Sequence, residues 1–219
     1  MHILVLGGTG PCGIQLIQQS LELNHTVVVY ARSPQKLPAD ISANPSVTIV
    51  QGELTDAEKL SSAMQGVQAV VSALGPVVTS VHPSNTPLAN GYALVIKTMK
   101  QHDVKRLILL GAPSIRDEHD RFSLTVTGMI AVVATLARNG YKDLVAVGKT
   151  IRAADPKDLV WTIARVPFLT DNEDRSAIAG YVGDGKFRIR LGRAAFAAFV
   201  LGELEKNEWC HKAPLISSP

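Results

Sequence analysis

Three glycines near the N-terminus have a spacing that suits phosphate binding. Gly7, Gly10 and Gly13 lie in the run GGTGPCG, between an apolar run at residues 3–6 and a segment of helical period. Glycine lets the backbone turn tightly and approach a pyrophosphate closely, and the positive end of the helix dipole favours its charge. Because strand, turn and helix coincide, we predict a dinucleotide-binding turn; glycines that serve only a tight turn are the alternative.

A basic residue follows the second apolar run, at a place where an NAD-preferring site has an Asp or Glu for the ribose 2′-hydroxyl. This chain has Arg32 there, followed by Ser33 and Lys36. A guanidinium can donate two parallel hydrogen bonds to a phosphate and stack on adenine, so these residues predict NADP(H) as the cofactor in preference to NAD. The alternative is a solvated surface arginine, since loops after strands often hold basic residues.

These groups need a parallel sheet to position them, and the order of the apolar runs predicts one. Short β-branched runs alternate with segments of helical period, as in repeated βαβ units. The fold class is therefore α/β, a Rossmann-type doubly wound parallel sheet with helices on both faces and a small C-terminal cap on the substrate side. The expected strands are residues 3–6, 26–30, 47–50, 69–73, 107–110 and 161–166.

The helices expected between and after these strands cover residues 56–64, 88–101, 123–139 and 144–154, besides the one that follows the glycines. Gly140 is the expected stop of the helix at 123–139. Residues 179–191 predict a hairpin or a strand, and residues 193–206 an amphipathic helix. No linker divides the chain, so we expect one domain over residues 1–219, with the substrate-side elements mainly after residue 166.

Composition limits the classes of partner. Of the 219 residues 46% are hydrophobic, which predicts a large core and excludes disorder as the main state. A net charge of +3 and an aromatic content of 5% argue against nucleic acid or a membrane as the partner and leave a small-molecule substrate. Whether the chain is a monomer or a homodimer stays open.

Two further features bear on location. Cys12 and Cys210 are far apart and lack ligand spacing, so we expect neither a disulfide framework nor a metal site. The N-terminus lacks the basic lead of a secretory signal, which favours a cytoplasmic location. The longest nearly uncharged run, residues 122–137, is shorter than the roughly 20 residues of a membrane span, and we expect a buried helix there.

The chain resembles the atypical short-chain dehydrogenase/reductases. The similarity lies in GGTGPCG, in YARSPQKL, in VVSALGP, in RLILLGAPS, in WTIARVPFL and in the late run RAAFAAFVLGELEK. Within that superfamily the chain is similar to the NmrA-like NAD(P)-binding group, which includes the biliverdin-IXβ/flavin reductases. The resemblance implies a Rossmann sheet over nearly the whole chain.

It also implies a set of cofactor contacts, residue by residue. For the pyrophosphate they are Gly7, Thr9, Gly10, Pro11, Cys12 and Gly13, and for the adenosine end Arg32, Ser33 and Asp56. For the middle of the cofactor they are Ala73, Leu74 and Gly75. The nicotinamide would be flanked by Gly111, Ala112 and Pro113 with Val166, Pro167 and Phe168.

The chain departs from the usual catalytic pattern of the superfamily, a Tyr-x-x-x-Lys pair with a serine. Tyr141 is followed at that spacing by Val145, not by lysine. Ser114 is the best candidate for a catalytic hydroxyl. An equally good interpretation is that this hydroxyl forms a hydrogen bond within a turn. Phe168 stands where the biliverdin/flavin reductases have a histidine.

For three other side chains we prefer a structural role to a functional one. His82 and His119 are expected to be surface histidines, since nothing local pairs with them. Cys12, at a helix N-terminus, is expected to be a small filler under the pyrophosphate; an oxidant-sensitive thiolate is the alternative. The rings expected to face a substrate are Phe168, Tyr92 and Phe187.

These observations favour an NADPH-dependent oxidoreductase that reduces a small planar acceptor such as a flavin, quinone or conjugated carbonyl. Hydride transfer to such acceptors needs mainly orientation and an apolar slot, so the missing Tyr/Lys pair does not exclude it. The alternatives are a catalytically weak NADP(H)-sensing regulator and a non-redox biosynthetic enzyme on the same scaffold, because the fold indicates the cofactor far better than the reaction.

Overall fold

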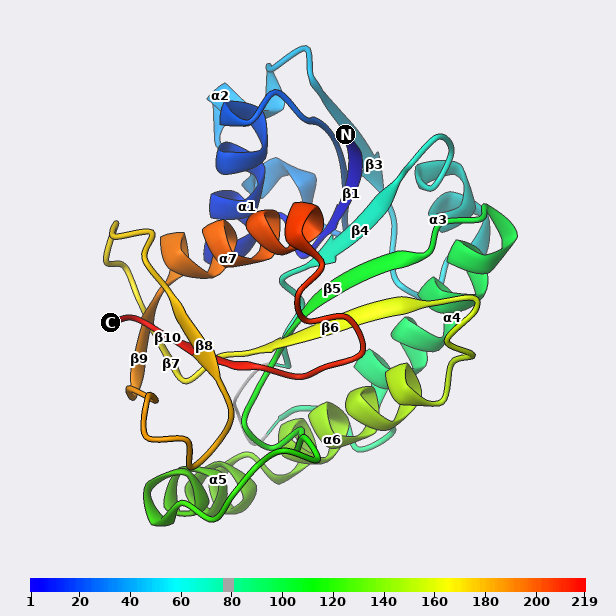
Figure 1. Ribbon diagram of the computed structural model, residues 1–219. Coiled ribbons are helices and arrows are strands. Elements are labelled where there is room, and N and C mark those ends of the chain that lie inside the picture. The colour runs from blue at the N-terminus through cyan, green and yellow to red at the C-terminus, as the bar shows by residue number, and fades with distance from the viewer. Residues whose placement is uncertain (77–80) are drawn as a thin grey trace.

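The structure, a computed structural model, describes residues 1–76 and 81–219. Its main feature is an eight-stranded sheet in the order β3-β2-β1-β4-β5-β6-β10-β8 (Figure 1). The first six strands along the chain run parallel, and each prediction for them is confirmed to within one residue. Their bounds are β1 (His2–Leu6), β2 (Thr26–Ala31), β3 (Val47–Gln51), β4 (Ala69–Ser72), β5 (Arg106–Gly111) and β6 (Val160–Arg165).

The central strands are buried because their sequences are apolar on both faces. β1 and β2 read HILVL and TVVVYA, as expected for parallel strands covered by helices on both sides. The strand order reverses between β1 and β4, where the chain leaves one half of the sheet and starts the other. Ligands of such sheets bind outside the carboxyl ends of the strands at this reversal, where the GGTGPCG turn lies.

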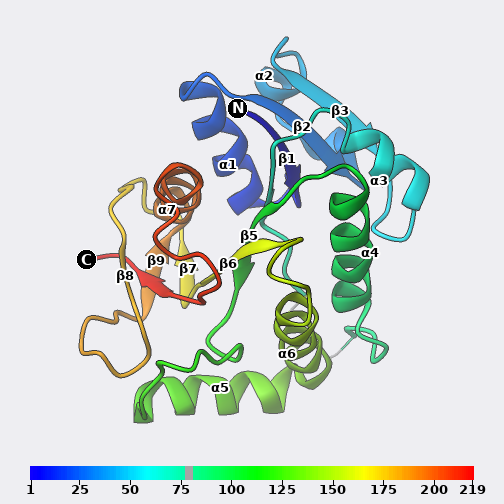
Figure 2. The ribbon, with the colours of Figure 1, turned by 45° about the vertical axis from the view of Figure 1, so that its right-hand side comes forward.

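Two layers of helices cover the sheet, which confirms the doubly wound α/β class (Figure 2). Helices α1 and α7 pack on one face, where Leu16, Ile17 and Phe196 are fully buried. Helices α3, α4 and α6 cover the other face. The bounds are α1 (Pro11–Glu22), α2 (Ala39–Ser42), α3 (Ala57–Ala63), α4 (Pro87–Gln101), α6 (Arg138–Arg152) and α7 (Arg193–Lys206), with a short 3-10 helix η1 (Pro34–Lys36) after β2.

The segment after β6 builds the far edge of the sheet. β10 (Leu215–Ser217) lies between β6 and the antiparallel β8 (Ile178–Gly180), and β7 (Phe168–Thr170) pairs with β9 (Arg190–Gly192) in a second, two-stranded sheet. The hairpin predicted for residues 179–191 is therefore wrong, although strands occur at both ends of that segment. Two glycines with positive φ, Gly183 and Gly185, carry the chain from one sheet to the other.

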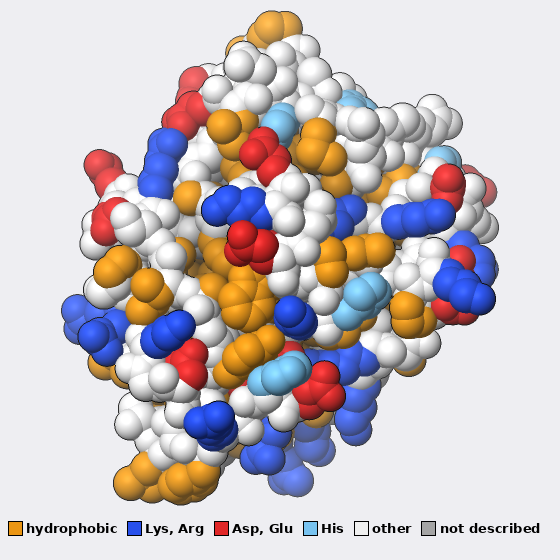
Figure 3. Space-filling model, viewed as in Figure 1, with side chains coloured by type: hydrophobic (Ala, Val, Ile, Leu, Met, Phe, Trp, Pro, Cys, Tyr) orange, Lys and Arg blue, Asp and Glu red, His pale blue; other side chains and the backbone are white. Residues whose placement is uncertain are grey.

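Helix α5 (Leu124–Leu136) contradicts two predictions. The apolar run at 122–137 is not a buried helix: Leu124 is 76% exposed and Leu136 72%, and hydrophobic side chains gather over α5 at the lower left of Figure 3. The helix also ends before Gly140, which lies inside α6, because Ala137 leaves the helical conformation at φ −133° and ψ 51°. Both sheet faces are already covered by other helices, so an apolar sequence was not enough to bury this one.

None of the helices in the described ranges is both long enough and apolar enough to cross a membrane.

Candidate functional site

The glycine turn joins β1 to α1 so tightly that backbone atoms exclude side chains at Gly7 and Gly13. Gly7 has a φ of 75°, and a Cβ on it would lie 3.0 Å from the carbonyl carbon of Ala73. A Cβ on Gly13 would lie 2.1 Å from the carbonyl oxygen of Gly7. Gly10 differs, because a Cβ there would have its nearest neighbour at 3.6 Å. Gly7 and Gly13 therefore build the turn, and Gly10 leaves space beside it.

That space opens into a cavity of about 510 Å³ over the carboxyl ends of β1, β4, β5 and β6. Helices α5 and α6 close it on one side through Met129, Ile130, Val133, Tyr141 and Leu144. The remaining described lining residues are Gly10, Pro11, Cys12, Ala73, Gly75, Pro76, Leu110, Gly111, Ala112, Pro113, Ser114, Val166, Pro167, Phe168, Leu169 and Arg193.

Most of the predicted nicotinamide-side residues meet in this cavity. The predicted site residues that line it are Gly10, Pro11, Cys12, Ala73, Gly75, Gly111, Ala112, Pro113, Ser114, Val166, Pro167 and Phe168. Gly7, Thr9, Gly13 and Leu74 are not among the lining residues, although Gly7 and Gly13 form the turn at its edge. Apart from Ser114, Tyr141 and Arg193 the lining is largely apolar, so the cavity suits a ligand group that is apolar.

Two polar residues of the cavity have no sequence signal that connects them with the cofactor. Tyr141 lines it from α6 and Arg193 from the first turn of α7. In the sequence, Tyr141 lacks the lysine that would mark it as catalytic, and Arg193 is only the first residue of an expected helix. No spacing in the sequence links either of them to the glycine turn, since the sheet brings them there from more than a hundred residues away.

The predicted adenosine-side residues lie outside the cavity, at the carboxyl ends of β2 and β3. Arg32 is exposed directly after β2, and its carbonyl oxygen accepts a hydrogen bond from Gln51 at 3.3 Å. The Asp56 carboxylate accepts a hydrogen bond from the backbone N–H of Lys59 at 3.1 Å and so caps α3. Arg32 thus has a side chain open to a 2′-phosphate, whereas Asp56 already has a structural partner.

We expect Arg32→Ala to raise the Kd for NADP about 30-fold, since a charge-assisted pair of hydrogen bonds contributes about 2 kcal/mol. The Kd for NAD should change less than about 3-fold, because NAD has no phosphate for the guanidinium to bind. Calorimetric titration of both dinucleotides measures the difference. Lys157→Ala, at the opposite end of the sheet, is a control of equal charge change. An equal loss for NAD and NADP would contradict the assignment.

Cys12 has the properties of a buried filler. Burial raises the pKa of its thiol to about 11, and the nearby Arg193 guanidinium lowers it only in part. A thiol with this pKa stays protonated at neutral pH, and protonated thiols react slowly with oxidants. This supports the filler interpretation over the oxidant-sensing thiolate.

The surface position predicted for His82 is wrong. Its side chain is 8% exposed, and its Nε2 lies 2.9 Å from Oδ2 of Asp143 on α6. The same carboxylate accepts hydrogen bonds from the backbone N–H groups of Leu88 and Ala89 at 3.0 and 2.9 Å. Asp143 therefore caps α4 from a neighbouring helix and holds His82 in place, a pairing with no local sequence signal.

Two of the three rings expected to face a substrate do not line the cavity. Tyr92 is fully buried, and its hydroxyl lies 2.6 Å from that of Ser72. Phe187 is also absent from the lining, so only Phe168 of the three is there. His119 is exposed as predicted, but it has a local partner, since its Nδ1 lies 2.8 Å from Asp117.

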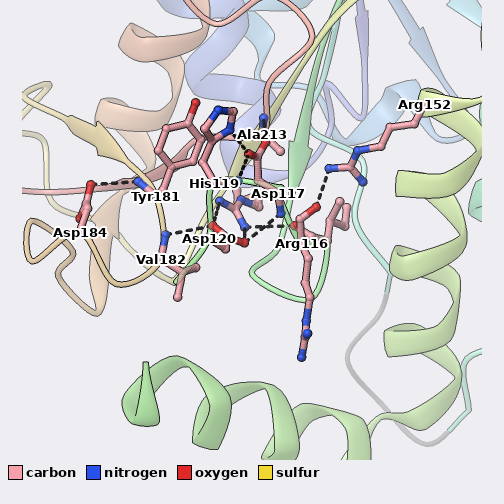
Figure 4. Close-up of polar contacts among 11 residues, drawn as sticks. Arg116, Asp117, His119, Asp120, Arg152, Tyr181, Val182, Asp184 and Ala213 are labelled. Atoms are coloured by element: carbon pink, nitrogen blue, oxygen red, sulfur yellow. Dashed lines mark hydrogen bonds and ion pairs between the residues drawn. The ribbon is translucent and has the colours of Figure 1, made fainter. Parts of the chain in front are cut away.

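A polar network fixes the loop that holds Ser114 (Figure 4). The buried guanidinium of Arg165, at the end of β6, donates to both oxygens of Asp120 at 2.6 and 2.8 Å. Asp120 also accepts from the Val182 N–H at 3.0 Å, and Asp117 from the Ala213 N–H at 2.8 Å. The loop between β5 and α5 is thereby tied to β6, to the turn after β8 and to the start of β10.

Within the described ranges, His, Cys, Asp and Glu side chains form no group of three or more that could hold a metal ion.

Comparisons with known proteins bear on the family and the fold of this chain. A family model described as NAD(P)H-binding matches residues 7–207. Photosystem II assembly factor Ycf39 from Synechocystis sp. is 40% identical over 73 residues, which make up 33% of this chain and 22% of that protein. The chain therefore matches less than a quarter of this relative's length.

Solved structures share the fold at low identity. A short-chain dehydrogenases/reductase from Veillonella parvula DSM 2008 in complex with NADP has a TM-score of 0.79 at 16% identity, covering 100% of this chain and 94% of that one. ChuY, an anaerobillin reductase from Escherichia coli O157:H7, has a TM-score of 0.73 at 15% identity, covering 100% and 98%. The predicted NAD(P)-binding family is confirmed by the family model, and the solved structures confirm the fold.

Proposed function

This chain belongs to the NAD(P)H-binding family, and on that premise we propose that it is an NADPH-dependent reductase of a small planar acceptor such as a flavin, quinone or conjugated carbonyl. The residues present fit the cofactor, since the glycine turn has no room for side chains at Gly7 and Gly13 and leaves an open approach at Gly10. When bound, NADPH supplies a hydride to the acceptor.

The observation that carries the proposal is the apolar lining of the 510 Å³ cavity beside that turn. Its walls combine proline, alanine, leucine, isoleucine, valine and methionine side chains with the ring of Phe168. Such a lining favours a flat apolar body and keeps water from the reacting atoms. An acceptor rich in hydroxyls or charges would lose its hydration there without new partners.

Two hydroxyl groups can donate hydrogen bonds or a proton to the acceptor. Ser114 and Tyr141 both line the cavity, from the β5–α5 loop and from α6. We assign Ser114 the role of donating a hydrogen bond to an acceptor oxygen or nitrogen, and Tyr141 that of a second donor. With no lysine among the described lining residues, Tyr141 lacks the cationic partner of a Tyr-x-x-x-Lys pair, so the proposal favours acceptors that need little acid catalysis.

NADPH oxidation against a panel of flavins, quinones and enones tests the proposal. We expect turnover with at least one class, and a rise of KM for that acceptor in Phe168→Ala, which removes the ring from the cavity wall. If calorimetry shows that the protein binds NADPH but no acceptor of the three classes causes NADPH oxidation, the reductase assignment is wrong.

A second candidate, an NADP(H)-sensing regulator, is favoured by one specific observation, the absence of a lysine beside Tyr141 in the described cavity lining. Such a protein binds the cofactor but oxidises it slowly. Proteins retained by the immobilised chain with and without NADPH would then differ, and identical sets would count against this candidate.

A further inference from the structure

The cavity has one charged side chain among its described lining residues, and it lies at the cofactor end. Arg193 starts α7 and lines the cavity together with Pro11 and Cys12, which start α1. Two helix N-termini and a guanidinium thus share one end of an otherwise apolar space. No described lining residue is acidic; the carboxylate that pairs with Arg193, that of Asp171, is not part of the lining.

Contacts between the two helices hold Arg193 in this position. The Gln19 side chain on α1 donates a hydrogen bond to the carbonyl oxygen of Ala194 at 3.0 Å, so the first turn of α7 is tied to α1. The guanidinium also lies close enough to the Cys12 thiol to oppose the rise in pKa that burial causes there. Arg193 therefore reaches the first turn of the helix whose N-terminus faces the pyrophosphate.

The present partner of Arg193 is replaceable. Its guanidinium forms an ion pair with Asp171, which follows β7. The Asp171 side chain is 90% exposed, whereas that of Arg193 is 24% exposed. Pairs with a solvated carboxylate contribute little, so a phosphate bound at the glycine turn competes with Asp171 for the guanidinium at small cost.

We propose that Arg193 binds the pyrophosphate of the dinucleotide and exchanges Asp171 for a phosphate oxygen when the cofactor enters. This residue lies about 180 positions after the glycine turn and adds a side-chain cation to a site otherwise made of backbone N–H groups. The inference rests on the cofactor binding of the family and not on the choice of acceptor.

Two substitutions with opposite expected effects on the Kd for NADP test the exchange. The measurement is calorimetric titration with NADP, without any acceptor. Arg193→Gln should raise the Kd for NADP about 10-fold, because a charge-assisted contact is lost. Asp171→Asn should lower it about 3-fold, because the competing carboxylate loses its charge. Arg175→Gln is the matched control. Arg175 pairs with the exposed Glu22 carboxylate on α1 at 2.6 Å but does not line the cavity. The Kd of this variant for NADP should equal that of the wild type.

A ligand without a pyrophosphate localises the effect. Adenosine 2′-monophosphate retains the adenine and the 2′-phosphate, so Arg193→Gln should leave its Kd unchanged. If both Asp171→Asn and Arg193→Gln weaken NADP binding, the pair is structural and the proposal fails. If NADP binding is unchanged in Arg193→Gln while KM for the acceptor rises, the arginine binds the substrate and the proposal fails as well. An inactive wild-type protein that still binds NADP rejects the reductase assignment alone.

Discussion

Replacing Gly13 by alanine should lower the free energy of unfolding by about 3 kcal/mol or more, since overpacking against fixed backbone is at the costly end of small-to-large substitutions. The added Cβ would lie 2.1 Å from the Gly7 carbonyl oxygen and 2.6 Å from the Gly8 Cα. Both are backbone atoms at the junction of β1 and α1, so relief requires the helix to move away from the sheet. Urea unfolding followed by circular dichroism measures the loss.

Gly10→Ala is the matched control at the next glycine of the motif. Its Cβ would have the Gly7 carbonyl oxygen at 3.6 Å as its nearest neighbour, so stability should stay within about 0.5 kcal/mol of wild type. NADP affinity should nevertheless fall at least about 10-fold, because Gly10 lines the cavity and a methyl group keeps the backbone from the pyrophosphate. If Gly10→Ala binds NADP as tightly as wild type, the pyrophosphate does not lie over this residue.

The second large effect is expected at Asp120. Asp120→Asn should destabilise the protein by about 3 kcal/mol, because it leaves the fully buried Arg165 guanidinium without its counter-charge. Glu22→Gln breaks a pair with the same chemistry, but both of its side chains are exposed, so its cost should stay below about 1 kcal/mol. Equal costs for the two substitutions would show that burial of Arg165 does not matter.

The loss of unfolding free energy caused by Asp120→Asn should become smaller as the pH falls. Burial by itself raises the pKa of this carboxyl, but hydrogen bonds from Arg165 and from the N–H groups of Asp117 and Val182 outweigh burial and lower the pKa below its usual value. A carboxyl with a lowered folded-state pKa stabilises the fold above its unfolded pKa of about 3.9 and loses this contribution as the pH falls through the folded pKa. Unfolding free energies measured from pH 7 to pH 3 should show wild type and Asp120→Asn converging at the acid end; parallel curves would contradict the linkage.

The sheet, and the segments that meet at the cavity, could be predicted from local sequence. Strands such as HILVL and TVVVYA are continuous apolar runs, and the glycine motif combines a turn, a helix start and a close backbone approach within seven residues. Each of these signals lies inside one segment, and the parallel topology then brings the segments together at one edge. This is why most of the residues expected near the nicotinamide line one cavity.

The errors concern contacts between segments far apart in sequence. Burial of His82 depends on Asp143, 61 residues later, and the hydroxyl pair of Tyr92 depends on Ser72. The exposure of α5 depends on which helices already cover the sheet. Arg193 became part of the site only because α7 packs on α1. None of these has a period or a motif in the sequence that could have revealed it.

The position of β10 has a consequence for how the chain completes its fold during synthesis. This strand comes last along the described chain, yet it lies inside the sheet, where Leu215 pairs with both Arg165 of β6 and Gly180 of β8. Until residues 215–217 leave the ribosome, β6 and β8 both present open edges with unsatisfied backbone groups. Such edges are templates for pairing with other chains. Folding of this edge of the sheet therefore has to wait for β10, even though the strands around the glycine turn can form long before.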